Sequence, residues 1–494
     1  MAGAGRPLVV ATLRTVLTFL ALLVTAASSI VLVRMLDPAS YAAYQALTKR
    51  VTRYALPVYG VFAGWIYRYA AQRIPGTVSA TICVAVAASL AGSLAAAVVS
   101  VKLGLHSASM ISALLALGLY TAFAVLQIPM NAARPVRFSV VTLAYRLVYS
   151  SLVVLLVYLA GAGLLGALLS VVVAASVGVG LQLLWLRSLG SLGSGCPADL
   201  LREWVRGVHV SLLGVSASLV ASLDIAAAYP LAGSMVVAAY FAATAFLALF
   251  REAVGTGIGY ISAYVLGGGS SQTALSALRL SLLATAPLAG YALVYPDHLI
   301  HLLNPQYAWA SAAVRIASAA VYVGLLASGY ISLAAGLIRG RVEETSHELA
   351  KINAAMLLSQ SFYLVLLVVG LYVLEDPALE AAWWASSLLL SSIVTASVGL
   401  LYLSGDARSG ALDAAKWSVV YLASALTSAA VAAPRLAPQR RFWDEVVVLL
   451  PSVAIHLTLY VLMVASLDAF ARKVLRRVPQ ALLELLAGSL QGNP

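Results

Sequence analysis

Three cations stand close together in the stretch YAAYQALTKRVTRYALPVYG, residues 41–60, near the start of an otherwise apolar chain. Lys49, Arg50 and Arg53 fall within five positions, on one side of a helix. If that helix crosses a membrane, a rise of about 1.5 Å per residue places them near the bilayer midplane. Three cations facing lipid there would cost on the order of 8–10 kcal/mol. The residue types therefore predict that they face a hydrated cavity or a partner.

Other ionisable residues interrupt apolar runs in the same way. The remaining bases at this depth are Arg146, Arg251 and Arg315, whereas the acids are mainly Asp224 and Glu252. Because the bases outnumber the acids, we expect a central cavity of net positive sign whose ligand is an anion. Asp224 could bind a coupling cation or proton, or it could pair with a base from another helix. Arg146 could contact the ligand or anchor its helix at the interface.

The composition indicates the class of protein that must position these residues. Of 494 residues, 62% are hydrophobic and 10% are charged, whereas an ordinary soluble domain has about 25% charged residues. Continuous apolar runs of roughly 20 residues predict membrane-spanning helices and exclude a barrel, whose strands would alternate. The chain therefore predicts an all-α polytopic membrane protein. We expect about fourteen helices, near residues 12–33, 41–66, 77–101, 108–130, 138–160, 164–187, 207–230, 234–264, 276–294, 308–337, 350–373, 379–403, 416–433 and 446–467.

Basic residues at the ends of these helices predict the orientation. With the N-terminus in the cytoplasm, nineteen Lys and Arg residues fall in inner loops and five in outer loops. This asymmetry predicts a multi-pass protein of the cell membrane with both termini cytoplasmic. It also accounts for the formal net charge of +12, so no nucleic-acid partner is expected.

A weak internal repeat predicts two six-helix lobes. SYAAYQA at 40–46 resembles VVAAYFA at 236–242, which pairs Tyr44 with Tyr240. We therefore expect an N-terminal lobe at 1–190, a cytoplasmic linker at 191–206, a C-terminal lobe at 207–403 and two additional helices at 404–468. The basic, leucine-rich segment 469–494 is expected to be an amphipathic tail on membrane lipids.

The remaining reactive side chains suggest no further chemistry. Cys83 lies in an apolar run and Cys196 in a loop far along the chain, so we expect two inert thiols. Asp297, His298 and His301 could ligate a metal, but no second cluster completes the coordination shell. We therefore predict neither a metal site nor a cofactor.

Two motifs resemble those of a known family. VLVRMLDPASYAAYQA, through Arg34, Leu36, Pro38 and Tyr41, resembles the junction of helices one and two in the polysaccharide flippases of the multidrug/oligosaccharidyl-lipid/polysaccharide exporter superfamily. The family's Arg-hydrophobic-Leu-Gly-Pro-acid-acid-Tyr-Gly pattern is only partly kept, because Asp37 replaces the first glycine and residues 39, 40 and 42 also differ. LLNPQYAWASAAVRIASAA at 302–320 resembles a second family motif, carried by Leu303, Pro305, Tyr307 and Arg315.

The resemblance implies a two-lobed transporter that flips a lipid-linked oligosaccharide to the outer leaflet by alternating access. The partners that the resemblance implies are the lipid-linked oligosaccharide, membrane lipids and glycan-assembly enzymes. Related murein-precursor flippases use cavity cations on helices one, two and eight, and Arg14, Arg53 and Arg251 occupy comparable helices here. The expected substrate-binding residues are thus Lys49, Arg50, Arg53, Arg146, Arg251 and Arg14.

Two other functions are compatible with parts of the sequence. A cation-coupled multidrug or metabolite antiporter of the same fold could use Asp224 for coupling, although the first helix carries no acid in residues 14–33. A membrane glycosyltransferase would need metal-binding or basic carboxylates, and the chain has no Asp-x-Asp pair and no loop long enough to fold alone. We therefore predict a transporter and no enzyme.

Overall fold

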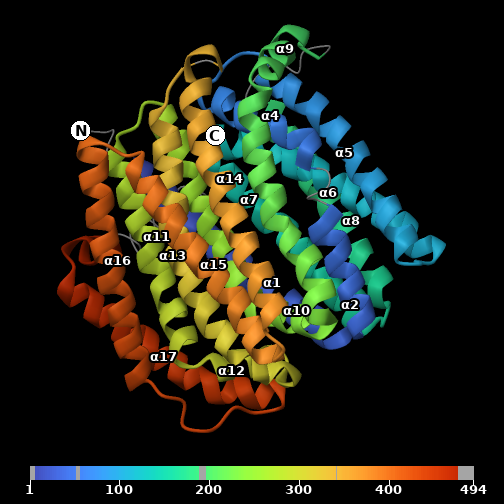
Figure 1. Cartoon of the computed structure of the whole chain (residues 1–494), viewed down its shortest axis with the longest axis vertical. Coiled ribbons are helices and arrows are strands. Elements are labelled where there is room, and N and C mark those ends of the chain that lie inside the picture. Colours follow the sequence, from blue (N-terminus) through green and yellow to red (C-terminus); the bar gives the residue numbers. More distant parts are fainter. Residues whose placement is uncertain (1–5, 52–55, 188–195, 341, 477–494) are drawn as a thin grey trace, which may run out of the picture.

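Helices account for every regular element in the part of the chain that the computed structural model describes, residues 6–51, 56–187, 196–340 and 342–476 (Figure 1). The first half contains α1 (Arg6–Met35), α2 (Pro38–Gln45), η1 (Ala46–Val51), α4 (Leu56–Ala71), α5 (Thr77–Lys102), α6 (Ser107–Ala133), α7 (Pro135–Val153), η2 (Val154–Leu159), α8 (Gly163–Leu186) and α9 (Ala198–Arg206). The second half contains α10 (Val208–Leu266), α11 (Ser271–Val294), α12 (Pro296–Leu303), η4 (Pro305–Ala310), α13 (Ser311–Leu337), α14 (Val342–Val373), α15 (Pro377–Leu401), α16 (Gly405–Val431) and α17 (Phe442–Leu467).

The predicted fold class is confirmed. Among the described residues, eleven helices are long and apolar enough to cross a membrane, and shorter apolar helices cover Leu23–Met35 and Met235–Ala245. The long α10 contains two predicted spans, because Gly233 breaks it with φ 80° and ψ 170°. Only glycine adopts this backbone conformation readily. The chain can therefore turn there without a loop.

Proline and a capping side chain start several helices at one end of the bundle, which we call the α12 end. Asp376 caps α15: its Oδ1 accepts hydrogen bonds from the N–H groups of Ala378 (2.8 Å) and Leu379 (3.0 Å). Pro377 then occupies the first helical position, where its missing N–H costs nothing. Asn304 precedes Pro305 in the same way and caps η4. These local signals explain why the sequence placed the start of α15 closely, whereas α14 and α16 begin at Val342 and Gly405, well before the expected 350 and 416.

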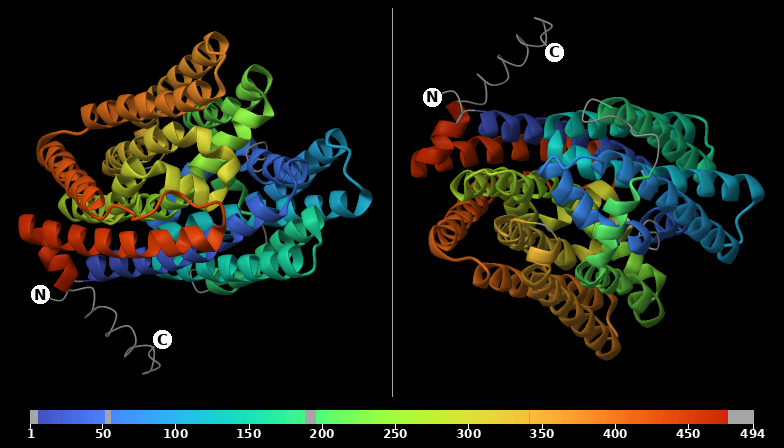
Figure 2. Two further views of the ribbon diagram at one scale, coloured as in Figure 1. Left: turned by 90° about the horizontal axis from the view of Figure 1, so that it is seen from below. Right: turned by 90° about the horizontal axis from the view of Figure 1, so that it is seen from above.

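The opposite end, which we call the α9 end, carries the ends of α4, α8 and α13 and the starts of α5, α10 and α14 (Figure 1). Figure 2 shows most of the first half of the chain, blue to teal, grouped on one side of the molecule, while the dark-blue α1 runs beside the red C-terminal helices. Contacts of α1 and α4 with α10 join the two halves of the chain. The boundary at residues 191–206 is a prediction that the packing alone does not test.

The last two helices pack against α11. Gly290 permits the close approach of α16, since a Cβ at this position would lie 2.6 Å from the Cβ of Ala425. The Arg279 guanidinium on α11 contacts the buried Asp468 carboxylate at 2.8 Å and donates to the Tyr421 hydroxyl at 2.8 Å. It also lies 4.3 Å from the Trp417 ring. This ion pair and ring contact attach α16 and the end of α17 to the second half.

Candidate functional site

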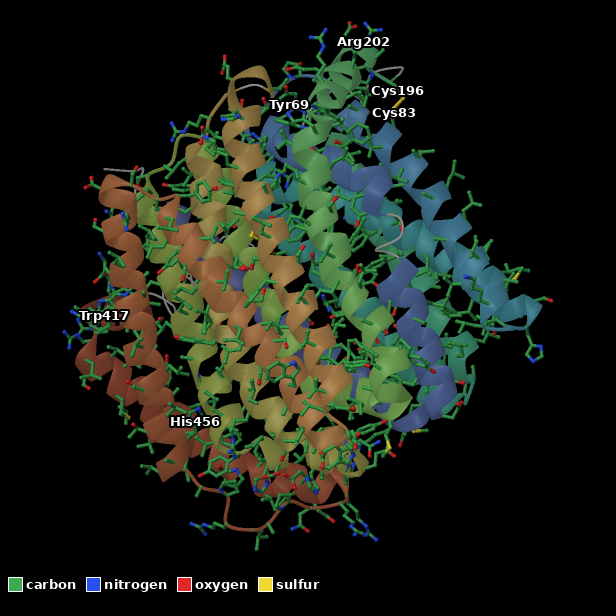
Figure 3. The ribbon with its side chains drawn as sticks, in the orientation of Figure 1. Tyr69, Cys83, Cys196, Arg202, Trp417 and His456 are labelled. Carbon is green, nitrogen blue, oxygen red and sulfur yellow. A yellow bond between two sulfur atoms is a disulfide. The ribbon has the colours of Figure 1, made fainter. Side chains whose placement is uncertain are left out.

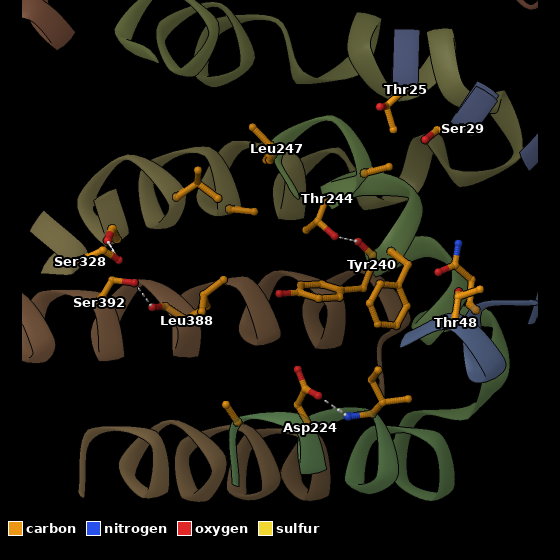
Figure 4. A pocket seen from close by; sticks show the side chains of 18 of the residues that line it. Thr25, Ser29, Thr48, Asp224, Tyr240, Thr244, Leu247, Ser328, Leu388 and Ser392 are labelled. Carbon is orange, nitrogen blue, oxygen red and sulfur yellow. Dashed lines mark hydrogen bonds between the residues drawn. The ribbon is translucent and has the colours of Figure 1, made fainter. Parts of the chain in front are cut away.

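A cavity of about 680 Å³ lies between the two halves of the chain. Its lining comes from α1, α2, η1, α6, α7 and α8 on one side and from α10, α13, α14 and α15 on the other. Hydroxyl groups from both sides surround it, including Thr25 and Ser29 of α1 and Thr244 and Ser328 across from them (Figure 4). A polar cavity shared by two halves of a helical bundle is a typical place for a transported ligand.

The opening stretch of the sequence forms one wall of this cavity. Tyr41, Tyr44, Gln45 and Thr48 all line it. These positions follow the i, i+3, i+4, i+7 spacing, so they share one helix face. Lys49 follows directly in η1, a π-helical segment of residues 46–51. Single π-helical turns often occur at functional sites.

Gln45 has an unused hydrogen-bonding group. Its Oε1 is buried and has no hydrogen-bond partner among the described residues. A buried amide oxygen without a donor is unfavourable, so the site favours a ligand or water that donates a hydrogen bond there. Sequence reasoning missed Gln45, although its spacing from Tyr41 and Tyr44 would have indicated the polar face.

Arg146 on α7 lines the cavity. Its Nη1 donates to the Thr25 hydroxyl on α1 at 2.8 Å. The neighbouring Ser150 hydroxyl donates to the Val24 carbonyl at 2.7 Å and ties the same two helices together. These bonds fix the guanidinium at the wall where α1 and α7 meet. Its contact with a ligand remains a prediction.

Asp224 lines the cavity from the second half of the chain. One of its oxygens accepts from the Tyr363 hydroxyl at 3.1 Å, and the other accepts from the Ile225 N–H at 2.7 Å. Tyr363 in turn accepts from the Trp384 indole N–H at 2.8 Å. The Trp384 ring stacks on Tyr240 with centroids 4.1 Å apart. Residues of α14 and α15 thus orient the Asp224 carboxylate.

The two tyrosines that the internal repeat pairs are both in the cavity wall. Tyr44 comes from the first half, where its hydroxyl is hydrogen-bonded to that of Tyr149. Tyr240 comes from the second half and stacks on Trp384. Aromatic rings with hydroxyl groups therefore face the cavity from both sides. Sequence reasoning identified the pair but not their partners Tyr149 and Trp384, which lie more than a hundred positions away along the chain.

The structure describes the other predicted substrate-binding cations only in part. The backbones of Arg14, Lys49, Arg50 and Arg251 are helical, in α1, η1 and α10, and their side chains lie outside the described part. Arg53 lies wholly outside the described residues. Among the described lining residues, Arg146 and Asp224 are the charged ones. The expected positive sign of the cavity thus depends on the first cluster and stays a prediction. Arg315 is exposed near the start of α13.

The histidines considered as metal ligands have other partners. The buried His298 contacts the buried Glu445 carboxylate at 2.7 Å, which joins α12 to α17. His301 is hydrogen-bonded to the backbone carbonyl of Asp297. In the described part of the chain, no three His, Cys, Asp or Glu side chains gather as a metal site would require.

The prediction of two inert thiols is wrong. Cys83 on α5 and Cys196, directly before α9, form a disulfide at the α9 end (Figure 3). The two residues are 113 positions apart in sequence. The hydrophobic run around Cys83 and the sequence separation from Cys196 concealed the pairing, because only the packing of α9 against α5 brings the two cysteines together. The amphipathic tail predicted for 469–494 is described only to residue 476, so Leu482, Leu483, Leu485 and Leu486 lie outside the described residues.

Comparison with known proteins gives a fold and no sequence relative. No protein-family model matches the chain, and no curated protein matches it. Among solved structures, an outward-facing multidrug resistance MATE family transporter of the MOP superfamily aligns with TM-score 0.59 and 13% identity, over 83% of this chain and 96% of that one. MATE in complex with MaD3S aligns with TM-score 0.56 and 12% identity, over 83% and 96%.

A third solved structure has a similar arrangement of helices. A mutant of the Vibrio cholerae MATE transporter VcmN aligns with TM-score 0.51 and 15% identity, over 83% of this chain and 97% of that one. At identities this low the likeness concerns the arrangement of helices and not the ligand. The chain thus has the fold of the MATE transporters of the MOP superfamily.

Proposed function

We propose that the chain is a membrane transporter that flips a polyprenyl-phosphate- or diphosphate-linked oligosaccharide from the cytoplasmic to the outer leaflet. The observation that carries this proposal is the cavity between the two halves, with its hydroxyl, tyrosine and arginine lining. Its volume is in the range of about 300–1,000 Å³ found for small-ligand sites. The likeness to transporters of the MOP superfamily supports movement of a ligand between two membrane sides.

The chemistry of the lining suits a phosphorylated glycan. Sugar hydroxyls both donate and accept hydrogen bonds, so they match Gln45 and the serines and threonines of the wall. Arg146 and the cations of the opening cluster would bind phosphate, because a guanidinium forms bidentate, charge-assisted bonds to phosphate oxygens. The isoprenoid chain would remain in the lipid. A glycan of this kind would be used in surface polysaccharide or glycan assembly.

A second candidate is a cation-coupled multidrug or metabolite antiporter. It is favoured by Asp224, a carboxylate on the cavity wall that Tyr363 and the Ile225 N–H hold in place. Ionisable residues at membrane depth often serve ion pathways. One neighbouring structure is described as a multidrug resistance transporter. The flippase remains our first choice because three bases, Lys49, Arg50 and Arg53, follow the lining residue Thr48 closely in the sequence.

The test is flipping in proteoliposomes. Purified protein is reconstituted with a fluorescent polyprenyl-diphosphate oligosaccharide, and movement of the headgroup between leaflets is measured. We expect wild type to exceed empty liposomes and the triple variant Lys49→Ala, Arg50→Ala, Arg53→Ala to lose at least about ten-fold in rate, since each phosphate contact is charge-assisted.

The matched control removes three exposed arginines from the α9 end, Arg187→Ala, Arg202→Ala and Arg408→Ala, and should flip like wild type. If wild type does not exceed empty liposomes with several glycans and ion gradients, the flippase proposal is rejected. Export of cationic dyes against a sodium or proton gradient is then the assay for the antiporter.

A further inference from the structure

Arg68 on α4 joins the two halves of the chain at the α9 end. Its Nη2 donates to the Ile338 carbonyl at 2.5 Å, and its Nη1 donates to the Ala335 carbonyl at 3.4 Å. Both acceptors belong to the last turn and C-cap of α13. The Arg68 residue is only 6% exposed. A buried cation of one half is therefore held by backbone of the other half.

The acceptors suit a cation for two reasons. The last four carbonyls of a helix have no partner within that helix, and the helix dipole makes this end negative. Arg68 satisfies two of these carbonyls and would leave them unpaired if the halves moved apart. Loss of a hydrogen bond to a charged group is costlier than loss of a neutral one. The contact therefore favours closure at the α9 end.

Neighbouring residues of α4 continue the same contact. The Tyr67 hydroxyl accepts from the Ala263 N–H of α10 at 3.0 Å. A Cβ placed on Gly267, just beyond α10, would lie 3.9 Å from the Ala71 carbonyl. Positions 67, 68 and 71 thus hold one turn of α4 against α10 and α13.

The short helix α9 supports this turn of α4 from the other side. Tyr69 is hydrogen-bonded to the Glu203 carboxylate and packs against the buried Trp204. The Cys83–Cys196 disulfide fixes the start of this segment to α5 (Figure 3). α9 therefore positions the helix that carries Arg68.

A weaker contact of the same kind occurs at the α12 end. Arg34, at the end of α1, donates through Nη2 to the Leu302 carbonyl in the last turn of α12 at 3.3 Å. Its guanidinium lies 5.1 Å from the Phe442 ring. Unlike Arg68, Arg34 is exposed to solvent. Arg34 belongs to the first family-like motif and Leu302 to the second, so their hydrogen bond brings the two motifs together.

We propose that Arg68 is the gate residue at the α9 end: by binding the C-terminal carbonyls of α13 it keeps that end of the cavity closed. Arg34 is the weaker counterpart at the α12 end. This inference rests on the proposed function, because only alternating access requires each end to open in turn. Since Arg68 is buried and binds two carbonyls, the closed α9 end is the favoured state of the chain without ligand.

Disulfide crosslinking tests the gate without any substrate, so the result is independent of the flipping assay. The pair Ala71→Cys and Gly267→Cys spans the two halves beside Arg68, and the native cysteines are already paired. We expect rapid crosslinking in this background. Arg68→Met should lower the crosslinking rate about ten-fold or more, and Arg68→Lys should give an intermediate rate.

Two further variants make the result specific. Arg202→Met removes an exposed arginine at the same end and should leave the rate unchanged. Arg34→Met should not lower the rate, because it weakens the opposite end only. If Arg68→Met crosslinks as fast as Arg202→Met, the gate proposal is overturned. Where Arg68→Met does not fold, Arg68→Lys decides: an unchanged rate overturns the proposal and a slower rate supports it.

Discussion

Individual side chains of the cavity are held by partners on neighbouring helices. Asp224 is the clearest case, because Tyr363 and the Ile225 N–H bind its two oxygens and Trp384 in turn binds Tyr363. A carboxylate oriented in this way loses less entropy when it binds a cation. Gln45 differs, since its buried Oε1 has no partner among the described residues. The polar atoms of Asp224 are thus already held by protein partners, whereas the Gln45 Oε1 is left for a ligand or water.

Asp224→Asn tests the role of the charge. The amide has nearly the same shape as the carboxylate, so the fold should be retained while a bound cation loses its counter-charge. We expect the gain in transport rate given by a sodium or proton gradient to disappear, and the rate without a gradient to persist. Both rates are measured in the same proteoliposomes.

Tyr363→Phe is the companion to this variant, because it keeps the charge and removes one hydrogen bond to it. It should retain most of the gradient response. A full gradient response in Asp224→Asn would exclude Asp224 from coupling.

At the scale of elements, α9 and its disulfide organise the α9 end. α9 buries Trp204 against Phe62 and Tyr69 of α4, and the Cys83–Cys196 bond closes a loop of 113 positions. A crosslink over so long a loop restricts the unfolded chain strongly. This segment also leads directly into α10, so it connects the two halves of the chain.

We expect Cys83→Ser with Cys196→Ser to lower the free energy of unfolding by about 2–5 kcal/mol. The measurement is the thermal midpoint in detergent, with and without reductant. Reductant should lower the midpoint of wild type and leave that of the double variant unchanged. Two free thiols in wild type denatured without reductant would contradict the disulfide.

At the scale of the whole molecule, charge and redox chemistry bear on the same question of orientation. The loops that the charge asymmetry assigns to the cytoplasm gather at the α9 end, which also carries the disulfide. Disulfides are uncommon in a reducing cytoplasm. The positive-inside pattern involves many residues and the disulfide only two, so a cytoplasmic α9 end stays our prediction.

Single exposed cysteines test this orientation. Ser409→Cys lies at the α9 end and Ala437→Cys at the α12 end, and both positions are exposed. We expect a membrane-impermeant maleimide to label Ala437→Cys on intact cells and Ser409→Cys only after permeabilisation. The reverse pattern would place the α9 end outside and would agree with an oxidising environment for Cys83 and Cys196.

The sequence by itself determined the elements and their order. A membrane-spanning segment must satisfy its own backbone hydrogen bonds, so each long apolar run becomes a helix wherever it packs. Proline and capping residues such as Asp376 and Asn304 then fix the boundaries locally. The shared face of Tyr41, Tyr44, Gln45 and Thr48 went unnoticed but could have been predicted in the same way, because helical spacing does not depend on distant residues.

Only the tertiary structure decided which side chains meet. Arg68 and Ala335 are 267 positions apart, and Tyr363 and Asp224 are 139 apart. The disulfide was missed for the same reason. No local sequence pattern encodes these contacts, because they depend on how helices that are distant in the sequence pack against one another. Since apolar helix faces are chemically alike, their pairing is set by the fit of many side chains together.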